Sequence, residues 1–122
     1  MGWWAHLADD RGNDEGSWNF THNTNGMIAE ALQAATGETV EECGGPLGPV
    51  IGPAWWERLN GMTGPEGGEF LDTIVKALMA DPVRFEAMNP ENGWGSYESL
   101  LKVLADMRDS VPEWPCVWQA SG

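Results

Sequence analysis

The stretch from Trp3 to His22, WWAHLADDRGNDEGSWNFTH, predicts a β-hairpin at the start of the chain. Residues 3–8 and 17–22 read as two strands, in which successive side chains point to opposite faces. The residues between them, 9–16, are rich in Asp, Asn and Gly, which favour turns. A hairpin alone is only marginally stable, so we expect other parts of the chain to cover one of its faces.

Apolar residues recur at helical spacing downstream of the hairpin. One helix is expected between the N-cap candidates at 21–25 and Gly37, which suits a C-terminal cap. The segment Thr63-Gly64-Pro65-Glu66 has the pattern of a capping box, and an apolar stripe continues from it to about Ala80. These signals predict two of the three main helices.

Further start and stop signals divide the rest of the chain. Ser96 is a suitable N-cap for the third main helix, and Pro112 ends it. Short helical turns are expected at 54–59 and after Asp81-Pro82. The tail at 114–119 suits a third strand at a sheet edge, since Pro115 lacks a ladder N–H.

These elements together predict an α+β fold in a single domain, residues 1–122. The hairpin and the C-terminal strand would form a small antiparallel sheet, and the three main helices would pack on one of its faces. A Gly/Pro-rich loop at 38–53 interrupts the helical region. A chain of 122 residues can bury an adequate core without a disulfide or a metal.

The charge of the chain is strongly negative. Six Lys and Arg stand against 19 Asp and Glu, which gives a formal net charge of -13. Direct binding to nucleic acid or to an anionic membrane surface is therefore not expected. The acidity suits either solubility alone or the attraction of a basic protein partner. In a more specific form of the second interpretation, the protein mimics DNA. We find no signal peptide or membrane span and expect a cytoplasmic protein.

Metal and cofactor sites are not indicated. His6 and His22 fall on opposite faces of the predicted hairpin, and no zinc-ligand spacing surrounds them. The acids at 9–15 do not have the spacing of a calcium-binding EF-hand loop. Cys43 and Cys116 are expected to be reduced in the cytoplasm, although the sequence leaves open whether they pair. We therefore predict no metal and no cofactor.

No catalytic motif is recognisable. Ser17 and Ser96 lack the nucleophile-elbow pattern, and the glycines at 44–48 lack the Lys and Ser/Thr of a phosphate-binding loop. We accordingly expect a protein without enzymatic activity.

Strand parity selects a candidate binding patch. If helices cover one side of the hairpin, Trp3, Leu7, Trp18 and Phe20 point into the core. The residues that would share the uncovered side are Trp4, His6, Asn19 and Thr21. A tryptophan beside polar groups suits contact with a ligand or a partner. In the alternative, the Gly/Pro-rich loop at 38–53 covers this side and encloses Trp4 in a second small core.

Several segments resemble patterns found in one group of proteins. Residues 18–27, WNFTHNTNGM, fit N-x-T-x-N-x-x-x-M, and residues 81–85 and 89–98, DPVRF and NPENGWGSYE, fit DPxxF and NPxNGWGxYE. Together with LNGMT at 59–63, they resemble a group of small uncharacterised proteins of actinobacterial bacteriophages and their hosts. The resemblance covers most of the chain except the loop at 44–53. It implies a phage context but no activity, catalytic residue or cofactor.

The expected function is therefore binding. We expect a small phage accessory protein that binds a host or phage protein. Two alternatives remain: a protein that binds or sequesters a small molecule of sugar or nucleotide type, and a minor virion or assembly component. The oligomeric state is left open.

Overall fold

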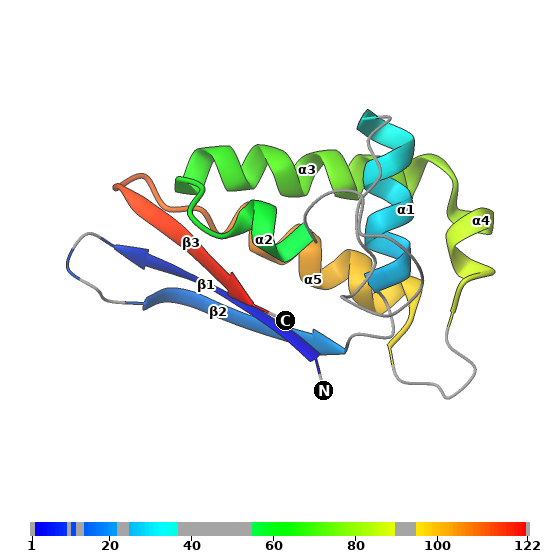
Figure 1. Cartoon of the computed structure of the whole chain (residues 1–122), viewed down its shortest axis with the longest axis horizontal. Coiled ribbons are helices and arrows are strands. Elements are labelled where there is room, and N and C mark those ends of the chain that lie inside the picture. The colour runs from blue at the N-terminus through cyan, green and yellow to red at the C-terminus, as the bar shows by residue number, and fades with distance from the viewer. Residues whose placement is uncertain are drawn as a thin grey trace.

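The protein has two layers, one of strands and one of helices. Its structure, a computed structural model, describes residues 2–9, 11, 14–21, 25–36, 55–89 and 95–121. Within these residues three strands and five helices follow the order β1-β2-α1-α2-α3-α4-α5-β3. Figure 1 shows the helices on one side of the sheet. The predicted α+β fold is therefore confirmed.

The strands are β1 (Gly2–Asp9), β2 (Asp14–Thr21) and β3 (Cys116–Ser121). They form one antiparallel sheet in the order β2-β1-β3, so the hairpin and the C-terminal strand meet as predicted. The third strand begins after Pro115 and not at Trp114, because proline has no N–H to donate to a ladder. The predicted loop at 38–53 and His22 lie outside the described residues.

Strand parity is as the sequence predicts. Trp3 and Leu7 of β1 are buried beneath the helices, and Trp18 of β2 is partly buried against the same core. Phe20 is paired with Trp3 in the register, although its side chain lies outside the described part of the structure. Alternate residues of the same strands consequently face away from the helices.

The helices are α1 (Asn25–Thr36), α2 (Trp55–Leu59), α3 (Gly64–Ala80), α4 (Pro82–Glu86) and α5 (Tyr97–Asp109). The predicted capping box is present: Thr63 Oγ1 accepts the Glu66 N–H at 3.3 Å, and Glu66 Oε1 accepts the Thr63 N–H at 3.2 Å. The side chains of Asp81 and Ser96 cap α4 and α5 by accepting the Arg84 and Ser99 N–H groups, without the reciprocal bond. Local capping chemistry therefore sets these three helix starts.

Tryptophan supplies much of the core volume. Trp3, Trp55 and Trp118 are among the largest fully buried side chains, and Trp3 meets Trp55 edge-on with ring centroids 4.8 Å apart. Trp118 Nε1 donates to the Gly64 carbonyl at 3.2 Å, which satisfies its polar atom within the core. These rings connect β1 and β3 to α2 and to the start of α3.

Two glycines at the start of α3 permit a close approach to β3. A Cβ built on Gly67 would overlap the Trp118 ring, and one on Gly64 would come within 2.5 Å of Cys116 Sγ. Glycine within a helix costs about 1 kcal/mol relative to alanine. Here that cost is offset by direct packing of the helix backbone on the strand.

The outer margin of β3 is occupied by the segment between α2 and α3. The Gly61 N–H donates to the Trp118 carbonyl at 2.8 Å, and the Trp118 N–H donates to the Met62 carbonyl at 2.8 Å. The Ala120 N–H donates to Asn60 Oδ1 at 3.1 Å. Although β3 is the last strand of the sheet, the outward N–H and C=O of Trp118 and the outward N–H of Ala120 are thus satisfied within the chain.

Candidate functional site

The side of the sheet opposite the helices presents a polar surface with one large aromatic side chain. Two cross-strand rows form its centre: Asn19–Trp4–Ser121 and Ser17–His6–Gln119. We call these six residues the outer face. Figure 1 draws the helices on the other side of the sheet, so the outer face is accessible within the described structure.

Trp4 and His6 form a stacked pair at the centre of the outer face. Their ring centroids lie 5.0 Å apart and their planes differ by 2°. His6 Nε2 is 2.7 Å from Gln119 Oε1, which holds the imidazole from the neighbouring strand. The Trp4 side chain remains 44% exposed. The indole is thus supported on one side and open on the other, so little side-chain entropy remains to be lost on binding.

Three of the four predicted site residues have described side chains. Trp4, His6 and Asn19 lie together on the outer face, with Asn19 exposed beside Trp4. Thr21 pairs with Gly2 at the end of β2, and its side chain lies outside the described residues. The alternative prediction has the loop at 38–53 enclosing Trp4 in a second small core. Trp4 is exposed, and the loop itself lies outside the described residues.

Gln119 was missed as a site residue. It reaches the outer face because β3 lies beside β1, and this pairing joins residues 113 positions apart in the chain. In the predicted strand at 114–119, alternate side chains point to opposite faces of the sheet. If this strand is placed beside β1, the alternation puts Gln119 on the outer face. The sequence did not determine that neighbour.

A hollow of about 490 Å³ lies where β3 begins. Its lining is mostly apolar and includes Pro65, Pro112, Trp114, Pro115 and Val117. Trp114 is 54% exposed. The charged groups in its lining are the carboxylates of Asp9 and Glu113. We call this the Trp114 hollow; its size and mixture of groups suit a small ligand.

A second hollow, of about 530 Å³, is lined by residues of α1, α3 and α4. Two cations contribute to it, but both are in ion pairs: Lys76 with Asp72 at 2.8 Å, and Arg84 with Glu30. Because each charge already has a partner, this hollow is a poor site for an anion.

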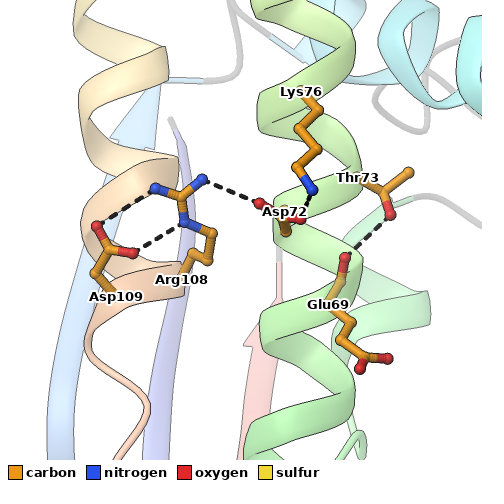
Figure 2. Close-up of polar contacts among 6 residues, drawn as sticks. All are labelled: Glu69, Asp72, Thr73, Lys76, Arg108 and Asp109. Carbon is orange, nitrogen blue, oxygen red and sulfur yellow. Dashed lines mark hydrogen bonds and ion pairs between the residues drawn. The ribbon is translucent and has the colours of Figure 1, made fainter.

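Charged side chains on α3 and α5 link the two helices through ion pairs. Figure 2 shows Arg108 reaching from α5 to Asp72 on α3 while it also contacts Asp109. Hydrogen bonding to Lys76, aided by Arg108, lowers the pKa of Asp72 although desolvation opposes the change. The hydrogen bond to Asp109, with a smaller contribution from Asp72, raises the pKa of Arg108. Asp72 is thus held negatively charged and Arg108 positively charged, and their ion pair favours the contact between α3 and α5.

Metal-binding chemistry has little support among the described residues. Within them, no group of three or more His, Cys, Asp or Glu is placed to hold a metal ion. Cys116 is buried at the start of β3, while Cys43 lies outside the described part of the chain.

No helix of the described structure has the length and apolar character needed to cross a membrane. Comparisons of the chain with protein-family models, with curated proteins and with solved structures give no match.

Proposed function

We propose that the chain is a binding protein without enzymatic activity, whose outer face recognises another protein. The observation that carries the proposal is the Trp4–His6 stack, a large ring held in place and left 44% exposed. Tryptophan is enriched among residues that dominate binding energy at protein interfaces. The resemblance to phage proteins further suggests a host protein as the partner and the host cytoplasm as the location.

The shape of the outer face favours a protein over a small molecule. Neither hollow described above is lined by Trp4 or His6. The stack instead lies on a strand surface, flanked by Asn19 and Gln119, which offer hydrogen bonds around an aromatic centre. An apolar anchor within a polar rim is the usual anatomy of a protein interface.

The net charge of -13 favours a basic partner. Opposite charge accelerates encounter between proteins and discriminates against acidic partners. We therefore expect association to slow as ionic strength rises.

Affinity purification from an actinobacterial host lysate tests the proposal with two matched variants. Trp4→Ala and Trp114→Ala each remove one exposed indole, the first from the outer face and the second from the Trp114 hollow. We expect Trp4→Ala to weaken partner affinity about 30-fold, equivalent to roughly 2 kcal/mol, and Trp114→Ala to leave it unchanged. Full retention of a stoichiometric partner by Trp4→Ala would contradict the proposal.

A sugar-binding role is the second candidate, and the Trp114 hollow favours it. The exposed indole offers a stacking surface for a pyranose, while Asp9 and Glu113 offer acceptors for hydroxyl groups. Those carboxylates disfavour a phosphate, which argues against a nucleotide. Thermal shift against a saccharide panel tests this role, since saturation at 100 times the Kd stabilises by about 2.7 kcal/mol. Trp114→Ala should abolish any shift that is due to this hollow.

A further inference from the structure

The two margins of the sheet differ in how their backbone groups are satisfied. The order β2-β1-β3 places β2 at the margin opposite β3. The margin of β3 is occupied by the segment from Asn60 to Thr63, as described above. Among the described residues no strand pairs with the other side of β2, which Figure 1 shows at the border of the sheet.

The register determines which backbone groups of β2 point outward. Trp118 and Ala120 direct their N–H groups away from β1, toward the Asn60–Thr63 segment. Since backbone groups in an antiparallel sheet alternate in direction, the intervening residue Gln119 bonds toward β1 and its register partner His6. In β1, residues on either side of His6 then bond toward β2.

The same alternation continues across β2. Ala5 and Leu7 bond toward their register partners Trp18 and Gly16. The N–H and C=O groups of Ser17 and Asn19 are therefore directed away from β1, and both residues are exposed. These groups form a short row of donors and acceptors at the open margin.

The sequence of β2 does not protect this margin. Natural edge strands are commonly blunted by Lys, Pro or a bulge. The segment from Ser17 to Thr21 contains no Lys and no Pro, and the register irregularity of the hairpin lies opposite Leu7 and Ala8, away from it. A regular edge of this kind accepts an additional strand readily.

Charge indicates which strand it would accept. From Gly12 to Glu57 the chain contains seven acids, including Asp14 and Glu15 of β2, and no Lys or Arg. A second copy would carry the same net charge of -13, so two copies would repel each other. A basic segment would instead be attracted to it.

The position of Trp4 supports the same occupant. Trp4 is the register partner of Asn19, so a residue added opposite Asn19 would lie two strand spacings from Trp4, about 10 Å. An arginine there can extend its side chain over Asn19 toward the exposed face of the indole, where a cation is favoured. The margin and the outer face would then contact one partner together.

We propose that the β2 margin from Ser17 to Thr21 binds an extended basic segment of the partner protein by β-strand addition. This inference rests on the proposed function and names its binding mode. Backbone hydrogen bonds from Ser17 and Asn19 provide the docking, and Arg or Lys side chains at alternate positions provide the selectivity.

A synthetic probe tests the strand addition directly. The probe is an eight-residue peptide of alternating Val and Arg, acetylated and amidated, and its controls replace Arg by Glu or methylate every backbone nitrogen. We expect the Arg peptide to bind and to slow hydrogen exchange at the Ser17 and Asn19 amides. We expect each control to bind at least tenfold more weakly. Equal binding by the methylated or the Glu peptide, or no binding by the Arg peptide, overturns the inference.

Two variants at one position separate backbone from side chain. Asn19→Pro removes the outward N–H, which an edge strand tolerates, while Asn19→Ala removes only the side chain. We expect the proline variant to bind the Arg peptide at least tenfold more weakly than the alanine variant, with the folding of both checked by circular dichroism. Equal affinities in the two folded variants overturn the inference. Dimers in sedimentation that Asn19→Pro dissolves would overturn it in favour of a second copy.

The same variants distinguish the two proposals. If Trp4→Ala releases the protein partner and Asn19→Pro does not, the outer face binds without strand addition, and only the inference fails. If Asn19→Pro releases the partner and Trp4→Ala does not, the margin is the site and the proposal for the outer face fails.

Discussion

Gly67 shows how one missing side chain sets the distance between two elements. A Cβ at this position would overlap the Trp118 ring. We expect Gly67→Ala to lower the free energy of unfolding by about 1–3 kcal/mol, because overpacking exceeds the gain in helix propensity. Urea unfolding monitored by fluorescence measures the change.

Gly68→Ala is the control for that substitution. Its nearest neighbour would be Val111 Cγ2 at 3.2 Å, a side-chain methyl that can adjust. We expect its stability to be unchanged or raised by up to about 1 kcal/mol. Equal losses in the two variants would show that helix backbone effects, and not contact with Trp118, govern this region.

Tyr97 completes the C-terminal end of α3. Its hydroxyl donates to the Leu78 carbonyl at 2.8 Å, and the residue four positions after Leu78 is Pro82, which has no N–H to offer. Tyr97→Phe leaves this carbonyl without the hydroxyl, so we expect a loss of about 1–2 kcal/mol in urea unfolding. A loss below about 0.3 kcal/mol would show that water replaces the bond.

Alkaline pH gives a second test of Tyr97. Burial, followed by the charge of Glu86, raises its pKa above the ordinary value of 10.0. The folded state therefore holds the proton more tightly than the unfolded state, and this contribution is lost as pH rises from about 10 through the folded pKa. Tyr97 is the one tyrosine in the chain, so ultraviolet absorbance of tyrosinate follows it directly. As the pH rises above 10, we expect the free energy of unfolding to fall less in Tyr97→Phe than in the unsubstituted protein.

At the scale of elements, helix starts are set by local chemistry. Ser96 Oγ accepts the Ser99 N–H at 3.2 Å at the beginning of α5. We expect Ser96→Ala to cost about 1 kcal/mol in thermal or urea unfolding. Ser99→Ala keeps the backbone donor and should change stability by less than about 0.5 kcal/mol. A larger loss in Ser99→Ala would contradict the capping account.

The same locality explains what the sequence could predict. The capping box at Thr63, the Asp81-Pro82 restart and the parity of β1 depend on neighbours within a few residues, and each appears as predicted. The contact of Gln119 with His6 and the binding of Trp118 by the Gly61–Met62 segment depend on which distant strands meet. Local patterns carry little information about that choice, because any strand of correct parity fits.

The candidate site divides in the same way. Trp4, His6 and Asn19 could be placed on one face from alternation alone. The contact of Gln119 with His6 and the open margin of β2 depend on the order of the strands and their register.

At the scale of the whole molecule, the net charge of -13 opposes compactness. We expect the urea midpoint to rise from about 20 mM to about 0.5 M NaCl, because salt screens repulsion between exposed acids. A triple variant with Glu69, Glu86 and Glu113 replaced by Gln should respond less to salt. A midpoint that falls with salt would show that ion pairs such as Arg108–Asp72 outweigh the repulsion.

The unequal margins of the sheet limit how the molecule can assemble. Within the described part of the chain, Asn60–Thr63 already occupies the β3 side, which leaves the side beyond β2 for an added strand. A contact between two β2 margins therefore consumes the same margin of both molecules, so this contact cannot propagate into a filament. Complexes formed through it should have a fixed one-to-one stoichiometry, even at high concentration.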